Sequence, residues 1–219
     1  MRILAVDLLT PDLAATVRFY NELLELPRAL STGSRAAFTV GYSSLRFRLA
    51  APTTGPFYHL AFSLAANHLR AAHDWVAARV PLLPGPAGDT LVDFPNWNAQ
   101  AFYFHDATGN ILECIARSPG LVSSPATFNS TALTGICEMG LAVPDVAATA
   151  ALLHQTYDVP YYSPGPRLPH FTPLGDDQGL FILSAVGRGW LPTGRPAEQH
   201  AGQVLVEQNG QRFLLDFPT

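Results

Sequence analysis

Two carboxylates lie inside otherwise apolar segments. Glu113 lies in the run ILECIA, and Glu138 lies in the run GICEMGLAV. Because burying an unpaired carboxylate is costly, each must face a cavity or a cationic partner. For Glu113 this favours a place in a functional site. For Glu138, an ion pair with a cation such as Arg167 or Arg188 competes with a role in a site, where it could act as an acid or base.

Aromatic and amide side chains gather shortly before Glu113. The stretch VDFPNWN covers residues 92–98 and precedes a strand expected from Ala99 to Phe104. Trp97 and Asn98, with Gln100 and Phe102 on that strand, are candidates for substrate binding, although the stretch also fits a structural corner whose polar side chains satisfy turn amides. Side chains alternate along a strand, so Tyr103, a candidate acid or base, faces away from Phe102 and Gln100. The sequence leaves open which face borders a cavity.

A repeated segment gives the elements that must position these residues. Residues 8–27 read LLTPDLAATVRFYNELLELP and residues 141–160 read LAVPDVAATAALLHQTYDVP, with 7 of 20 positions identical. The segment predicts a strand that enters a helix through a Pro-Asp turn, with Asp12 and Asp145 as helix caps. Helices are expected after Asp12, over residues 67–80 and over residues 146–157. Asn209-Gly210 predicts a tight hairpin between strands at 204–207 and 212–217.

Strand, helix and two or three strands recur three times, followed by a remnant without a helix. This pattern predicts an α+β fold whose units pair so that curved mixed sheets enclose a cavity. We expect a first domain at residues 1–117, a linker at 118–134, where Ser, Thr and Pro are frequent, and a degenerate second domain at 135–219.

Composition narrows the class of protein. Hydrophobic residues make up 48% and charged residues 14%, which indicates a folded globular chain. The net charge of −4 and the lack of a basic patch argue against nucleic acid as a partner. No apolar run approaches the roughly 20 residues that cross a bilayer, which argues against a membrane partner. Residues 2–9 read as a strand rather than a signal peptide, so we expect a cytoplasmic protein in which Cys114 and Cys137 are reduced core thiols.

Three stretches resemble the vicinal oxygen chelate superfamily, which includes glyoxalases, bleomycin-resistance proteins and ring-opening dioxygenases. They are TPDLAATVRFYNELLEL, YHLAF at residues 58–62 and FYFHDATGNILECI at residues 102–115. The resemblance covers residues 1–117 well and residues 135–192 in degenerate form. It implies a glyoxalase-like fold of βαβββ units, with the third unit degenerate and the fourth reduced to strands.

The same resemblance implies a metal site. His59 and Glu113 match two ligand positions of the metal-binding members. The corresponding positions of the first unit hold Ala5 and, near the end of the unit, Phe47, and neither residue can bind a metal ion. By the 133-residue offset of the repeat, Ala5 corresponds to Glu138. A third ligand is therefore sought among Asp7, Gln100, Tyr103 and Glu138, or water; His59 also fits a histidine hydrogen-bonded on a half-buried strand.

These residues leave three functions open. The first is a metal-dependent lyase or isomerase that acts on a small oxygen-rich metabolite, with Zn, Mn, Fe or Ni held by His59 and Glu113 and with Glu138 or Tyr103 as acid or base. The second is a metal-free protein of the resistance type that binds or sequesters a small molecule. The third is a ring-opening dioxygenase, for which a second histidine ligand is missing. We expect a small-molecule ligand in each case, in a monomer or a homodimer.

Overall fold

The computed structural model describes residues 1–51, 55–118 and 127–217. Residues 1–51 contain β1 (Arg2–Thr10), α1 (Leu13–Val17), the π-helix η1 (Arg18–Leu23), β2 (Arg28–Ser31), β3 (Arg35–Val40) and β4 (Ser43–Leu49). Residues 55–118 contain β5 (His59–Leu64), the 3₁₀ turn η2 (Ala66–His68), α2 (Leu69–Ala77), β6 (Leu82–Leu83), β7 (Val92–Phe94), the 3₁₀ turn η3 (Pro95–Trp97), β8 (Ala99–His105) and β9 (Ile111–Arg117).

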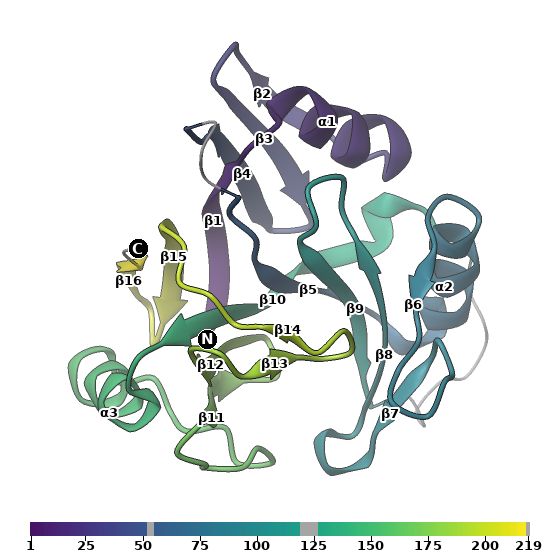
Figure 1. Cartoon of the computed structure of the whole chain (residues 1–219). Coiled ribbons are helices and arrows are strands. Elements are labelled where there is room, and N and C mark those ends of the chain that lie inside the picture. Colours follow the sequence, from purple (N-terminus) through teal and green to yellow (C-terminus); the bar gives the residue numbers. More distant parts are fainter. Residues whose placement is uncertain (52–54, 119–126, 218–219) are drawn as a thin grey trace.

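Residues 127–217 begin with the 3₁₀ turn η5 (Ser130–Ala132). They continue with β10 (Leu133–Val143), α3 (Val146–Tyr157), β11 (Phe171–Asp176), β12 (Gly179–Ala185), the short pair β13 (Gly189–Trp190) and β14 (Arg195–Pro196), and the hairpin β15 (Gly202–Gln208) and β16 (Gln211–Phe217). Over the described residues, 14 strands join into one mixed, curved sheet, and α1, α2 and α3 lie at its periphery (Figure 1). The expected α+β class is confirmed.

The two copies of the repeated segment fold alike where they enter and leave their helices. Asp12 Oδ1 accepts from Ala15 N and Asp145 Oδ1 accepts from Ala148 N, both at 2.9 Å. These bonds satisfy amides that the first helical turn leaves without partners.

Strand pairing links residues of the expected domain 1–117 to residues of the expected domain 135–219. β5 pairs antiparallel with β10 and parallel with β9, and β10 pairs parallel with β12. β1 pairs parallel with β4 and antiparallel with β15. The second unit therefore shares its sheet mainly with the third, and the first unit with the C-terminal hairpin. β1 and β10 meet at Ile3 and Ile136. Local periodicity carries no information about these long-range partners.

Three further differences concern the segments between strands. Of the expected linker 118–134, residues 119–126 lie outside the described residues, and β10 already begins at Leu133. β2, at Arg28–Ser31, was not predicted because its residues are exposed and show no alternation. β11, which contains Pro173, was not predicted as a strand either; among the described strands it forms a ladder with β12 alone, and such an edge strand tolerates proline.

Buried apolar residues form two clusters, one on each face of the sheet. The outer cluster packs the helices against the sheet and includes Phe62, Phe102 and Phe104. The inner cluster includes Ala61, Tyr103 and other residues of β8, β9, β10 and β12. Both cysteines are free and buried, as expected. Among the described residues, no helix has the length and apolar character needed to span a bilayer.

Candidate functional site

The register of four neighbouring strands places the ionisable residues in one row on the inner face. Ala61 of β5 lies opposite Glu113 of β9 on one side and opposite Glu138 of β10 on the other. Tyr103 of β8 lies opposite Glu113. His59 precedes Ala61 by two residues, so its side chain shares that face. Because the central residue of the row is an alanine, the side chains on both sides of it have room to converge.

A β-bulge directs Glu138 into this row. Ile136 lies opposite Phe62 and Glu138 lies opposite Ala61, so Cys137 is an extra residue on β10. Ile136 belongs to the outer cluster, whereas Cys137 belongs to the inner cluster and Glu138 borders the cavity. Without the bulge, two successive residues could not lie on one face of the strand.

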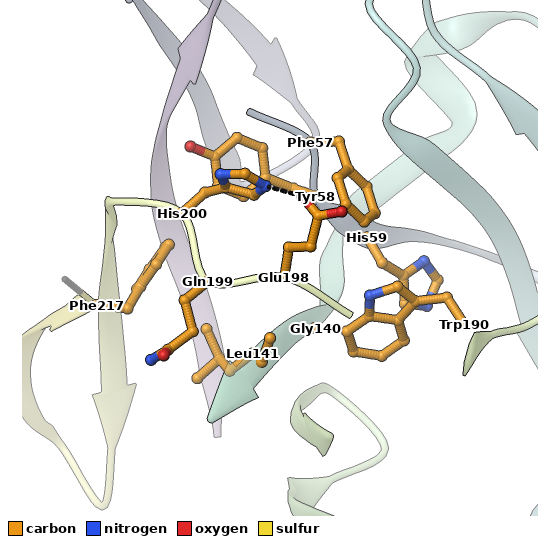
Figure 2. A pocket seen from close by; sticks show the side chains of 11 residues that line it. Phe57, Tyr58, His59, Gly140, Leu141, Trp190, Glu198, Gln199, His200 and Phe217 are labelled. Carbon is orange, nitrogen blue, oxygen red and sulfur yellow. Dashed lines mark ion pairs between the residues drawn. The ribbon is translucent and has the colours of Figure 1, made fainter. Parts of the chain in front are cut away.

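The hydrogen bond of His59 determines which ring nitrogen is free. Nδ1 lies 3.2 Å from the carbonyl oxygen of Ile111. Since a carbonyl oxygen only accepts, Nδ1 carries the proton, and the lone pair of Nε2 is available to a ligand. Figure 2 shows the ring beside Trp190, with the ring centroids 5.2 Å apart, and next to Gly140. Burial lowers the pKa of His59 to about 4, so the ring is neutral at pH 7.

Glu113 is a buried carboxyl group next to His59. Its side chain is 4% exposed, and its Oε2 lies 3.6 Å from Nε2 of His59. This distance is that of an ion pair, but burial favours the neutral forms of both groups. Burial, and next the charge of Glu138, raise the pKa of Glu113 well above its usual value, whereas a hydrogen bond from Tyr103 opposes this effect. Burial likewise raises the pKa of Tyr103, which is therefore a protonated phenol at neutral pH.

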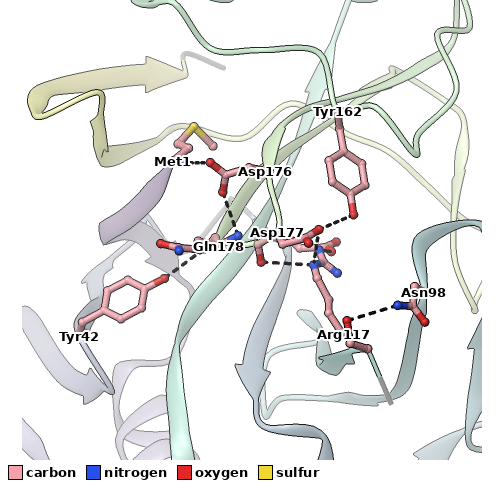
Figure 3. Close-up of polar contacts among 10 residues, drawn as sticks. Met1, Tyr42, Asn98, Arg117, Tyr162, Asp176, Asp177 and Gln178 are labelled. Carbon is pink, nitrogen blue, oxygen red and sulfur yellow. Dashed lines mark hydrogen bonds and ion pairs between the residues drawn. The ribbon is translucent and has the colours of Figure 1, made fainter. Parts of the chain in front are cut away.

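Glu138 has a cationic partner. Arg117 Nη2 donates to Glu138 Oε1 at 2.7 Å, so the partner is neither Arg167 nor Arg188, the two cations that we considered from the sequence. Arg117 also donates from Nε to the carbonyl oxygen of Asp177 at 3.2 Å (Figure 3). Burial raises the pKa of Glu138 to about 7, while the guanidinium of Arg117 acts in the opposite direction.

His59, Tyr103, Glu113 and Glu138 border a cavity of about 330 Å³. This volume lies within the range of sites that hold small metabolites. One side of the lining is polar and contains the row described above. The remaining lining is mostly aromatic and aliphatic, and it consists of Phe94, Asn96, Trp97, Ile115, Pro166, Leu168, Phe171, Ile182, Arg188, Trp190 and Leu191.

The donor atoms of His59, Glu113 and Glu138 fit a metal ion. One ligand atom from each residue lies within 4.8 Å of the others, and all three residues are buried. One imidazole nitrogen with two carboxylate oxygens is a donor set that suits Mn²⁺, Fe²⁺, Ni²⁺ or Zn²⁺. His59 also has the hydrogen bond from its second nitrogen that metal-binding histidines usually have. The arrangement can therefore bind a divalent ion and leave positions for a ligand.

Sequence-predicted residues divide between the two faces of the sheet. Trp97 and Tyr103 border the cavity, as do His59, Glu113 and Glu138. Three expected substrate-binding residues, Asn98, Gln100 and Phe102, do not border it, each for a different structural reason.

Phe102 is fully buried in the outer cluster because the parity of β8 directs it away from Tyr103. Gln100 shares that parity, and its amide donates to Asp93 Oδ1 at 2.6 Å. Asn98 ends η3 with a φ of +45°, and its amide donates to Ser118 Oγ at 3.2 Å. Asn98 thus belongs to a structural corner, the alternative to substrate binding that the sequence left open for this stretch.

In the first unit, Ala5 and Phe47 are buried among apolar residues, as their types indicate. Asp7, another third-ligand candidate, contacts Arg46 at 3.4 Å.

Sequence reasoning missed Arg117, Ile182 and Trp190. Trp190 follows Gly187-Arg188-Gly189, and two glycines directly before a large aromatic residue were the sequence feature that could have indicated a turn placing Trp190 at the site. A β-carbon on Gly140 would lie 2.9 Å from Trp190 Cη2, so the glycine provides the space that Trp190 occupies beside His59.

The fold of the chain is similar to that of a solved structure with a TM-score of 0.61, and this similarity concerns the fold alone. By sequence, no family model and no curated protein matches the chain.

Three solved structures illustrate the likeness. A "putative dioxygenase" from Bacillus subtilis subsp. subtilis str. 168 is 16% identical with a TM-score of 0.61, over 84% of this chain and 63% of that protein, so the present chain spans less than two thirds of its length. A glyoxalase/bleomycin resistance protein/dioxygenase from Nocardioides is 22% identical with a TM-score of 0.44, over 59% of this chain and 90% of its own. A lactoylglutathione lyase from Agrobacterium tumefaciens is 20% identical with a TM-score of 0.42, and the match covers 52% of this chain and 92% of that protein.

Proposed function

We propose that this chain is a metal-dependent lyase or isomerase of the glyoxalase type that acts on a small oxygen-rich metabolite. The observation that carries the proposal is the convergence of His59, Glu113 and Glu138 from three strands at the wall of one cavity. A binding protein has no need of three buried ionisable groups with mutually reachable donor atoms, and the cost of burying them argues for a role.

The chain's own residues have distinct roles in this proposal. His59 Nε2 and Glu113 hold the ion, which when bound supplies Lewis-acid polarisation of two adjacent substrate oxygens. Arg117 donates a hydrogen bond to Oε1 of Glu138 and so orients this carboxylate. Without a bound ion, burial raises the pKa of Glu138 to about 7, so this group can take up or release a proton near neutral pH. As a third ligand of the ion, Glu138 would instead be ionised. Tyr103 stays protonated and donates a hydrogen bond.

Two alternatives have weaker support. A metal-free binding protein would use the apolar lining around Trp97 and Trp190 and leave the three ionisable groups without a purpose. A ring-opening dioxygenase is suggested by the name of the Bacillus subtilis protein, but His59 is the one histidine among the described residues that border the cavity. Non-haem iron oxygenases commonly use two histidines and one carboxylate, so the donor set favours Lewis-acid chemistry.

Metal binding tests the proposal and separates it from the metal-free alternative. Metal content is measured on protein purified without chelator, and EDTA-treated protein is then titrated with Mn²⁺, Fe²⁺, Ni²⁺ and Zn²⁺ in thermal unfolding. At 100 times Kd, a bound ion adds about 2.7 kcal/mol, which corresponds to roughly 5–10 °C for a chain of this size. His59→Ala and Glu113→Gln should abolish most of this shift.

Matched controls are His73→Ala and Glu22→Gln, a histidine and a glutamate outside the cavity lining. The unfolding temperature of both variants should rise with added metal ion as much as that of the wild type. Trace metal only in the wild type, together with no thermal shift by any of the four ions, would overturn the enzyme proposal in favour of the metal-free protein.

A further inference from the structure

Arg188 is the one arginine among the described residues that border the cavity. Its backbone is fixed on both sides, because its amide donates to Ala185 O at 3.0 Å and its carbonyl accepts from Ala197 N at 2.8 Å. A turn at Gly187, with a φ of +84°, leads into it. The position of this arginine is thus set by the fold.

The guanidinium of Arg188 has no carboxylate partner among the described residues, in contrast to Arg46, Arg79, Arg117 and Arg212, which do. Its contacts are the ring of Phe171, with its Cζ 4.4 Å from the ring centroid, and the carbonyl oxygen of Gly189, at 3.4 Å from Nη1. An arginine fork presents paired donors to carboxylate or phosphate oxygens. Stacking on Phe171 holds one face of the guanidinium and leaves such donors available.

The cavity lining also indicates the shape of the part of a ligand that would not contact Arg188. Trp97, Phe171 and Trp190 contribute flat aromatic surfaces, and such surfaces favour planar apolar groups. Under the proposed function, Glu113 and Glu138 serve the metal ion, and Glu138 is already paired with Arg117. Among the described residues that border the cavity, Arg188 therefore remains as the cation without a carboxylate partner.

We infer that Arg188 recognises an anionic oxygen group of the substrate, so that the site selects small acids with a flat apolar body over their neutral analogues. This inference rests on the proposed function, because it assumes that the cavity is the substrate site. It adds a class of substrate, a carboxylate or phosphonate that has two further, adjacent oxygens directed toward His59 and the two glutamates. Arg188 is then the residue that determines the preference for acids.

Quenching of tryptophan fluorescence provides the test, because Trp97 and Trp190 border the cavity. EDTA-treated protein is titrated with benzoate, phenylphosphonate and neutral benzamide, and with 3,4-dihydroxybenzoate in the presence and absence of Mn²⁺. The variants are Arg188→Gln, the charge-conserving Arg188→Lys and the control Arg167→Gln. Arg167 also lies over an aromatic ring, that of Tyr161 at 4.0 Å, but does not border the cavity.

We expect wild type and Arg167→Gln to bind at least one of the two anions at least about tenfold more tightly than benzamide, and Arg188→Gln to lose this preference. Arg188→Lys should retain part of it, and benzamide should bind all variants within about twofold. Equal binding of acids and amide by the wild type, or the same preference in Arg188→Gln, would overturn the inference. If the preference depends on Arg188 but Mn²⁺ does not tighten binding of 3,4-dihydroxybenzoate, the metal proposal fails and the role of Arg188 stands.

Discussion

In metal-free protein, the buried carboxyl group of Glu138 should lower stability as the pH rises from 5 to 8. Burial raises the pKa of Glu138 from 4.5 to about 7. Between these two values the folded state holds a proton that the unfolded chain has already released, so this group makes the free energy of unfolding fall with increasing pH. The full shift corresponds to about 3 kcal/mol, of which about 2–3 kcal/mol falls between pH 5 and pH 8. His59, whose pKa burial lowers to about 4, acts in the opposite direction, so the contribution of Glu138 is measured as a difference between wild type and a variant.

The variant Glu138→Gln tests this contribution. It removes the carboxyl group, its contact with Arg117 at 2.7 Å and its effect on Glu113, whose pKa the charge of Glu138 raises. Arg117 keeps its bond to Asp177. At pH 5 the carboxyl group of Glu138 is mostly protonated, and at pH 8 it is mostly ionised. The change with pH in the stability difference between wild type and variant therefore measures the proton on Glu138 together with its coupling to Glu113.

The assay is urea unfolding in EDTA at pH 5, 6, 7 and 8, with Glu22→Gln as a control on an outer helix. We expect the wild type to lose about 2–3 kcal/mol more than Glu138→Gln between pH 5 and pH 8. Parallel pH profiles, or a wild type that gains stability relative to the variant as the pH rises, would refute the reasoning about burial.

Three further substitutions test the geometry of the site and of its supporting turn. Ala61→Leu should fill the space between the two carboxylates, lower stability by about 1–3 kcal/mol and reduce metal binding in a stoichiometry assay; normal loading would contradict the arrangement of the row. Gly140→Ala places a methyl group 2.9 Å from Trp190 Cη2 and should weaken metal binding through His59, measured by Mn²⁺ titration, whereas unchanged affinity would show that the wall yields freely. Asp106→Ala leaves the buried hydroxyl of Tyr20, now bonded at 2.8 Å, without an acceptor and should cost about 2–4 kcal/mol in urea unfolding; a loss below about 0.5 kcal/mol would speak against this buried network.

Local signals in the sequence predicted most of the elements. α3 spans Val146–Tyr157, as its cap and periodicity predicted, and Asn209-Gly210 turns between β15 and β16. The isolated carboxylate in ILECIA was sufficient to place Glu113 at a cavity. Each of these inferences depends on residues that are close in the sequence, where caps, turns and alternation act.

The composition of the site depended on contacts that local patterns do not encode. The bulge at Cys137 shifts the parity of β10, and it decides that Glu138 faces the cavity. The pairing of β10 with β5 brings Glu138, the residue that corresponds to Ala5 in the repeat, opposite Ala61 in the row. Arg188 and Trp190 reach the site from a loop more than seventy residues after Glu113. The alternation of Phe102 and Tyr103 was predictable from the sequence, but the face of β8 that borders the cavity was not, and Phe102 lies in the outer cluster.

The central claim is that one ion is held jointly by three side chains from β5, β9 and β10. Anomalous diffraction at the manganese edge, on crystals of the full chain soaked in Mn²⁺, tests it most directly. The account predicts a single strong peak about 2.0–2.3 Å from Nε2 of His59 and from carboxylate oxygens of Glu113 and Glu138. An empty cluster at saturating Mn²⁺, or a peak bound elsewhere in the molecule, would contradict it.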